Sequence, residues 1–229
     1  MRILGFLAAM AGLAGCEQEP PTAGAGEPKP ELALLTTLPI VFGESFGLEA
    51  ERNPLLAALE ERYEVVPVDG PEQLKPGGTL LAVQPQALTA ERLVALDRWV
   101  REGGRLVLLA DPSLRWESSR PLGDRFRPPY AYPDTGLLRH WGLTLEPEGE
   151  PAAEAVPHDL GGGAVATGSS FGRLASTSPS CTLTAQRGAA RCRIGRGQVT
   201  VVADADFALD PEQPEHQRAV VTLVGEVAR

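Results

Sequence analysis

Two apolar stretches, TLLAV at Thr79–Val83 and RLVLLA at Arg105–Ala110, decide the fold class. Neither alternates apolar with polar residues, as a strand with one face in solvent does. Continuous apolar strands are typical of a parallel sheet that is covered on both faces. Both stretches therefore predict central strands of an α/β domain with a mostly parallel sheet.

The sequence around these strands alternates helix and strand signals. Asn53 precedes Pro54, which is the pattern of an N-cap followed by proline at the first helical position. Thr89 can cap a second helix, and the glycines at 103 and 104 can end it. The same patterns predict further strands at 32–35, 63–68, 143–145 and 198–203, and helices at 53–62, 89–102, 134–141 and 216–228.

The N-terminus has the layout of a signal peptide. Arg2 supplies a positive charge, an apolar stretch follows, and small residues lie just before Cys16. This stretch is shorter than the about 20 apolar residues that cross a bilayer. LAGC at 13–16 resembles a bacterial lipobox, which implies that residues 1–15 are removed, that Cys16 is lipidated, and that Glu17 favours the outer membrane. The alternative is an apolar start with an unrelated cysteine.

Composition separates a tether from a folded domain. Residues 16–30 are the lipidated cysteine and a flexible linker, since EQEPPTAGAGEPKP contains no large apolar residue. Residues 31–229 are long enough for a single α/β domain with its own core. The chain has 21 Lys and Arg against 30 Asp and Glu, a net charge of −9, and loss of Arg2 makes it about −10. This charge repels phosphate backbones and anionic lipid headgroups, so nucleic acid is not an expected partner.

Two cysteines follow the N-terminal region, Cys181 and Cys192. In an oxidising periplasm an even number of cysteines indicates a disulfide. TLT at 182–184 and RCRI at 191–194 predict two β arms around the turn-like QRGA at 186–189. We therefore expect a C-terminal β-hairpin whose arms are joined by a Cys181–Cys192 disulfide with a structural role.

Polar residues gather where the predicted strands end. In open α/β sheets, ligands bind at the carboxyl ends of the strands. A long loop at 113–133, rich in Arg, Pro and aromatic residues, would roof this edge. The aspartates there could hold a hard cation or accept backbone amides, and we favour the second role, with no metal or cofactor. The candidate binding residues are Thr36, Thr37, Glu44, Gln84, Asp111, Trp116, Asp204 and Asp206.

Three segments carry a family resemblance: LLAVQPQALT at 80–89, WVREGGRLVLLADP at 99–112, and IGRGQVTVVADADF at 194–207. They are similar to the auxiliary, periplasm-facing component of gliding-motility-type ABC transport systems. The resemblance implies a flavodoxin-like three-layer sandwich, the fold also found in class I glutamine amidotransferases. It further implies that the partners are a permease and an ATPase of a transport system.

Two enzymatic functions are alternatives to a binding role. Amidotransferase chemistry needs a cysteine on a strand-to-helix turn, whereas the strand at 105–110 leads into Asp111-Pro112-Ser113. GSSFG at 168–172 matches the Gly-x-Ser-x-Gly elbow of α/β-hydrolases, followed in hydrolase order by Asp204 or Asp206 and then His216. RLASTSPS at 173–180 is a poor helix former, so the elbow lacks its usual context. A serine hydrolase using Ser170, Asp204 and His216 stays as an alternative.

The sequence as a whole predicts a non-catalytic periplasmic lipoprotein that acts as a binding or accessory subunit of an envelope or ABC-type transport assembly. Its expected partners are the membrane, through the lipid anchor, and a permease, an ATPase or other envelope proteins. A purely structural envelope lipoprotein is the second alternative, beside the serine hydrolase.

Overall fold

The computed structural model describes residues 28–44, 52–149 and 154–229. The predicted signal peptide at 1–15, the lipidation site Cys16 and most of the predicted linker lie outside the described residues. Within those described ranges, no helix combines the length and the hydropathy needed to cross a bilayer.

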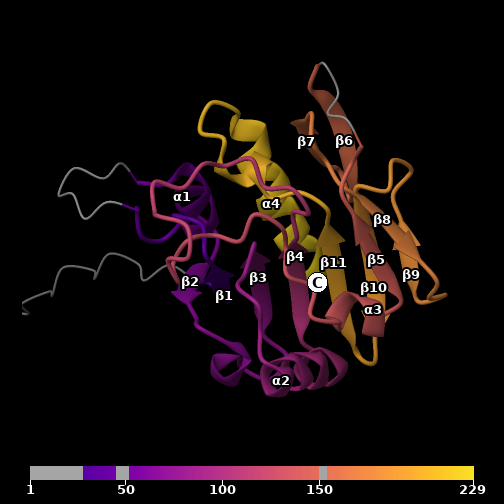
Figure 1. Ribbon diagram of the computed structural model, residues 1–229. Coiled ribbons are helices and arrows are strands. Elements are labelled where there is room, and N and C mark those ends of the chain that lie inside the picture. The colour runs from indigo at the N-terminus through magenta and orange to yellow at the C-terminus, as the bar shows by residue number, and fades with distance from the viewer. Residues whose placement is uncertain (1–27, 45–51, 150–153) are drawn as a thin grey trace, which may run out of the picture.

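A seven-stranded, mostly parallel sheet forms the centre of the domain, with strand order β2-β1-β3-β4-β11-β10-β9 (Figure 1). The first five strands in this order are parallel to one another, and β10 and β9 are each antiparallel to the strand before them in the order. The sequence-based prediction of an α/β domain with a mostly parallel sheet is therefore confirmed. The strands are β1 (Glu31–Thr36), β2 (Glu64–Pro67), β3 (Thr79–Val83), β4 (Arg105–Leu109), β9 (Cys181–Leu183), β10 (Ala189–Ile194) and β11 (Gly197–Val202).

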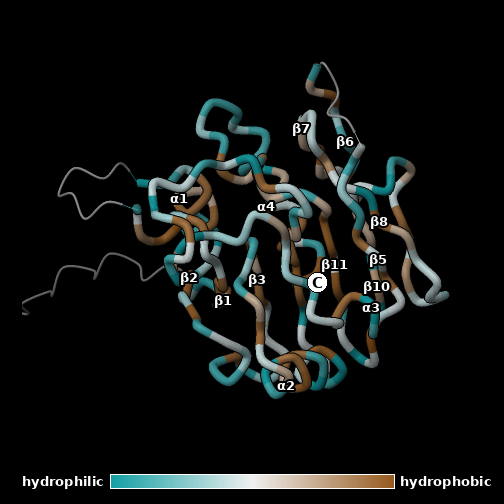
Figure 2. Tube along the Cα trace, viewed as in Figure 1, coloured by the Kyte–Doolittle hydropathy of each residue, from teal (hydrophilic) through white to brown (hydrophobic). Residues whose placement is uncertain are grey.

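Helices cover both faces of this sheet. One hydrophobic cluster joins the sheet to α1 and α4, and a second joins its other face to α2 and α3. Figure 2 shows hydrophobic residues along the central strands and on the sides of the helices. The helices are α1 (Pro54–Glu60), α2 (Ala90–Arg101), α3 (Leu137–His140) and α4 (Pro214–Val227), with short 3-10 turns η1 (Pro71–Gln73) and η2 (Asp206–Leu209).

The continuous apolar sequence of β3 follows from this double cover. Leu81 and Val83 pack into the cluster under α1 and α4, whereas Leu80 and Ala82 pack into the cluster on the opposite face. All five residues of β3 are buried. A buried leucine in such a strand stabilises the fold strongly, and truncation to alanine costs about 2–5 kcal/mol.

The helix starts agree with the sequence signals. The Asn53 side chain accepts hydrogen bonds from the amides of Leu55 and Leu56, at 2.9 and 3.3 Å. Thr89 caps α2 in the same way through the amide of Arg92. These caps satisfy amides that have no partner within their helix.

Two small two-stranded sheets, one of them the β6–β7 hairpin, extend the domain beyond the main sheet. β5 (Leu143–Glu146) pairs with β8 (Arg173–Ser176), and β6 (Val156–Gly161) pairs with β7 (Ala164–Gly168), all antiparallel. The strand predicted at 143–145 matches β5, whereas no strand was predicted over β6 or β7. Only two side chains of β6 are buried, at 158 and 160, so its apolar signal is too sparse to mark a strand.

The predicted disulfide is confirmed. Cys181 and Cys192 face each other directly across β9 and β10, with 4.1 Å between their Cα atoms. The turn between these strands contains Arg187 with a left-handed backbone, φ 61°. The bridge closes a hairpin at the edge of the main sheet.

Candidate binding site at the strand ends

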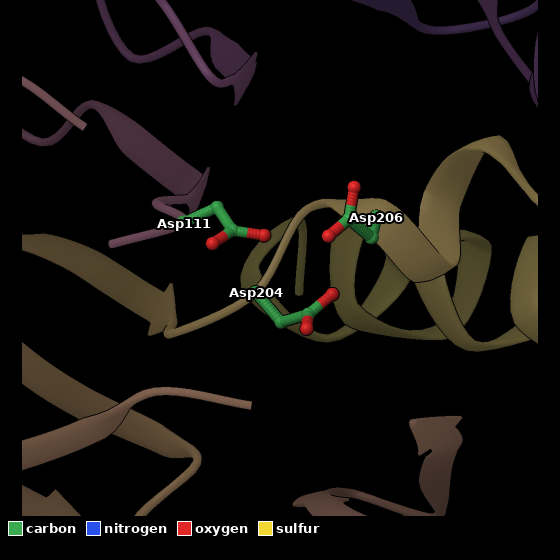
Figure 3. A group of neighbouring side chains, drawn as sticks. All are labelled: Asp111, Asp204 and Asp206. Atoms are coloured by element: carbon green, nitrogen blue, oxygen red, sulfur yellow. The ribbon is translucent and has the colours of Figure 1, made fainter. Parts of the chain in front are cut away.

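Three aspartates meet where β4 and β11 end. Asp111 follows β4, and Asp204 and Asp206 follow β11. Because Leu109 of β4 is paired in register with Val202 of β11, the chain leaves the two strands at the same edge. One carboxylate oxygen from each aspartate lies within 4.8 Å of the others, and Figure 3 shows the three side chains converging from these two connections.

Asp111 accepts two backbone amides. One oxygen accepts the N–H of Ser113 at 2.7 Å, and the other accepts the N–H of Ala205 at 3.1 Å. The first bond turns the chain after β4, and the second joins this turn to the segment after β11. The Asp111 carboxylate therefore holds two strand ends together through main-chain hydrogen bonds.

Asp206 and Asp204 also accept backbone amides. The two oxygens of Asp206 accept the N–H groups of Arg115 and Trp116, at 2.9 and 2.8 Å. Asp204 accepts the N–H of Phe207 at 3.2 Å, which starts η2. Hydrogen bonds from amides to carboxylates are stronger than neutral ones, so these aspartates fix the backbone around them.

Burial makes the charged forms of these aspartates costly. Burial first, and then the negative charge of Asp206, raise the pKa of Asp111 from 3.8 to about 6. Burial, reinforced by Asp111 and Asp206, raises the pKa of Asp204 well above its ordinary value. Burial also raises the pKa of Asp206, although amides from Arg115 and Trp116 oppose this rise. Burial thus favours the protonated form of these aspartates to a higher pH than that at which an exposed carboxyl group ionises.

Chemically, the cluster has two possible uses. Three carboxylate oxygens within 4.8 Å could hold a hard cation, which prefers oxygen ligands. Both oxygens of Asp111, both oxygens of Asp206 and one oxygen of Asp204 already accept amides of the strand-end turns. The amide-accepting role that the sequence analysis favoured is observed directly in these contacts.

Gln84 connects this cluster to the centre of the sheet. It follows β3 with a left-handed backbone, φ 43°, which is uncommon for a residue other than glycine. Its fully buried amide accepts the N–H of Asp111 at 2.9 Å and donates to the carbonyls of Asp111 and Pro129, at 3.1 and 3.0 Å. The hydroxyl of Thr37 donates to the Gln84 carbonyl at 2.5 Å. Gln84 therefore joins the ends of β1, β3 and β4.

Thr36 and Glu44 have different roles from the other predicted site residues. The Thr36 hydroxyl accepts the N–H of Leu38 at 3.0 Å and so caps the turn after β1. The Glu44 carboxylate accepts the hydroxyls of Ser118 and Ser119 and the amide of Ser119. Burial raises the pKa of Glu44, but these hydrogen bonds and the nearby Arg120 guanidinium outweigh it and lower that pKa below its ordinary value.

The loop at residues 113–133, which we name the strap, is an ordered connection between β4 and α3. Figure 1 shows it crossing the ends of β3 and β1 toward α1 before it returns. Its two arms lie side by side, because the N–H of Leu114 donates to the Tyr130 carbonyl at 2.8 Å and the Arg127 guanidinium donates to the Ser118 carbonyl at 3.2 Å. Gln86 ties the returning arm to the end of β3 by donating to the Arg127 carbonyl at 2.9 Å.

The strap presents different aromatic residues from the one predicted. Trp116 was expected to contact a ligand, but its side chain is partly buried and packs against the core. Phe126 and Tyr130 are the exposed aromatic residues of the strap. The sequence signal for them was the aromatic and Arg-rich composition of the loop, which does not say which ring is displayed.

In the described part of the chain, no hydrogen bond or ion pair joins Ser170, Asp204 and His216. Ser170 lies between β7 and β8, so two strands flank it in place of the strand and helix of a nucleophile elbow. The Nε2 atom of His216 accepts the amide of Thr167 at 3.0 Å, and among the described contacts it meets neither Ser170 nor Asp204.

The fold and the site at the carboxyl ends of the strands define the class of protein. It is a mixed α/β domain whose strand ends are covered by an anchored strap. The chain belongs to the family described as a domain of unknown function, DUF4350, whose model matches residues 54–222. The match includes Asp111, Asp204, Asp206, Gln84 and the strap, whereas Thr36, Thr37 and Glu44 precede the matched range. No curated protein matches this chain.

Solved structures share the fold at low sequence identity. The N-terminal domain of mmIFT52 has a TM-score of 0.53 and 12% identity over 87% of this chain and 97% of that domain. A β-galactosidase from Bacillus circulans sp. alkalophilus has a TM-score of 0.51 and 14% identity, over 86% of this chain and 31% of the enzyme. A cytoplasmic protein from Salmonella typhimurium LT2 has a TM-score of 0.50 and 11% identity, over 86% of this chain and 99% of that protein. This chain spans about a third of the β-galactosidase, and such likeness extends to the fold alone.

Proposed function

We propose that this chain is a non-catalytic accessory subunit of an envelope or ABC-type transport assembly, held in the periplasm by a lipid on Cys16. We also propose that its fold is flavodoxin-like. The parallel strands follow the order β2-β1-β3-β4-β11, which corresponds to the order 2-1-3-4-5 of flavodoxin. In that fold, ligands bind at the carboxyl ends of the strands beside the switch point between the first and third strands.

One observation carries the accessory role: the strap covers this edge and uses its polar groups. The Gln84 amide beside the switch point is hydrogen-bonded to main-chain groups of Asp111 and Pro129. The carboxylates of Asp111 and Asp206 accept strap amides. Groups that would otherwise serve a small substrate thus support a surface, which favours recognition of a macromolecule over catalysis.

Purification through a tag after Arg229 tests this role. From solubilised membranes of the native bacterium we expect an ABC-type permease or ATPase subunit, or another envelope protein, to copurify in stoichiometric amount. Recovery of the chain alone would favour a purely structural envelope lipoprotein.

The anchor and the non-catalytic character have their own tests. Radioactive palmitate should label the wild type and not Cys16→Ser, and an unlabelled wild type recovered with soluble proteins would refute the anchor.

A fluorophosphonate probe should not label Ser170. Labelling that Ser170→Ala abolishes would instead establish the hydrolase.

A further inference from the structure

Exposed hydrophobic side chains concentrate at the strap. Leu122 at its tip is 89% exposed, Tyr130 is 72% exposed and Phe126 is 55% exposed. Phe42 is 78% exposed and belongs to the segment that Glu44 binds to the strap. Single exposed apolar residues are ordinary, but several gathered on one element indicate an interaction surface. In the described ranges only three other large hydrophobic residues are exposed, Val94, Val156 and Val165.

Hydrogen bonds anchor the backbone of the strap at several points. Asp206 binds its first arm, Glu44 binds it near the tip, and Gln84 binds the returning arm. A turn closes the tip, where the N–H of Asp124 donates to the Pro121 carbonyl at 3.2 Å. A surface that is ordered before binding avoids part of the entropic cost of association.

The charge of the strap is opposite to that of the chain. The strap contains four arginines and two acidic residues, whereas the whole chain has a net charge of −9. Arg115 and Arg125 are exposed, and within the described residues neither makes an ion pair with a carboxylate. The Arg125 guanidinium lies 4.3 Å from the centre of the Phe126 ring, so cation and ring form one patch.

From this combination we propose that the outer face of the strap binds a segment of a partner protein in which Asp or Glu residues stand beside apolar side chains. Arg and aromatic residues are the types that dominate the energetics of protein interfaces. The positive charge of the strap complements carboxylates, whereas the acidic remainder of the chain repels extended polyanions such as nucleic acid or an anionic bilayer. The proposal rests on the accessory function and specifies the chemistry of its partner.

A random copolymer of Glu and Tyr, labelled with fluorescein, is the probe for this surface. Fluorescence anisotropy should show that the purified protein binds it in a salt-sensitive manner, and that it does not bind a copolymer of Lys and Tyr. The variant Arg125→Glu with Phe126→Ser should weaken binding at least about tenfold. The matched control, Arg98→Glu with Val94→Ser on α2, removes the same chemistry from another face and should bind like the wild type. Unchanged thermal melts of both variants show that their folds are intact.

Equal binding by the strap variant and the wild type would overturn the proposal, as would absence of binding. Binding of phosphatidylglycerol vesicles in preference to the copolymer would replace it with a membrane-binding strap. The tagged purification separates this proposal from the accessory function. If the strap variant still copurifies with the assembly, the accessory function stands and the strap proposal fails. If no assembly copurifies but the copolymer result holds, the strap surface stands and the accessory function fails.

Discussion

Asp111→Asn is expected to change the way stability depends on pH. Asp111 is fully buried, and its pKa is raised from 3.8 to about 6, so the folded state holds the proton more tightly than the unfolded state. The stability contributed by this proton is fully present below about pH 4 and is lost as pH rises through about 6. A rise from 3.8 to about 6 corresponds to about 3 kcal/mol.

Asparagine removes the titration but also removes one acceptor. Its carbonyl can replace only one of the two oxygens that accept the amides of Ser113 and Ala205, and the lost bond costs about 1–3 kcal/mol at every pH. Relative to the wild type, the variant should therefore be clearly less stable at about pH 4. At about pH 7 the relieved charge should offset most of that loss.

Urea unfolding followed by circular dichroism gives the free energy of unfolding of both proteins at each pH. The difference between them should change by about 2.5 kcal/mol from about pH 4 to about pH 7, which is most of the full linkage. Leu81→Ala is the control, because it destabilises the same domain through a cavity and removes no titrating group. A difference between Asp111→Asn and the wild type that is constant with pH would refute the electrostatic reasoning.

Three further predictions follow from the contacts. Replacing both Cys181 and Cys192 with Ser should lower the free energy of unfolding by about 2–3 kcal/mol in urea, and a reductant should lower the wild type equally but not the variant. Glu44→Gln should raise the rate of hydrogen exchange of the Ser119 amide about tenfold, with little effect on the core. Because the pKa of Glu44 is lowered from 4.5, its contribution to stability is present above pH 4.5 and is lost as pH falls. Acid should therefore loosen the wild-type strap in the same way. Millimolar Mg²⁺ or Ca²⁺ should leave the urea midpoint at about pH 7 equal to that in NaCl of the same ionic strength, because amides already occupy both oxygens of Asp111 and of Asp206. A stabilisation that Asp111→Asn abolishes would show instead that the cluster binds a cation.

The central layer of the fold could be predicted because its signals are local. Thr79–Val83 was predicted as a strand and β3 has the same bounds, since each of its residues is buried. The helix N-caps at Asn53 and Thr89 were likewise visible from neighbouring residues. β6 and β7 were not recognised, because they bury few side chains and owe their pairing to each other across the glycines at 161–163.

From the sequence, only the part of the site that directly follows predicted strands could be located. Asp111 and Asp204 follow strands that the sequence marks clearly, and parallel neighbours must end at one edge. The path of the strap depends on contacts between distant residues, such as that of Glu44 with Ser119, 75 positions apart. No local pattern encodes such a contact, and for the same reason the sequence assigned ligand contact to Trp116 and overlooked the exposed Phe126.

The aspartate cluster has a physical reason that does not require a ligand. Asp111 and Asp206 each accept two amides, one on each carboxylate oxygen. Asparagine has a single side-chain oxygen and its NH₂ group would face an N–H donor, so a carboxylate is the side chain that can satisfy both amides. The burial and the mutual repulsion that raise the pKa values of Asp111 and Asp204 therefore accompany the paired hydrogen bonds that hold the strap. Loss of either carboxylate should be felt first at the strap surface, several residues away from the substituted position.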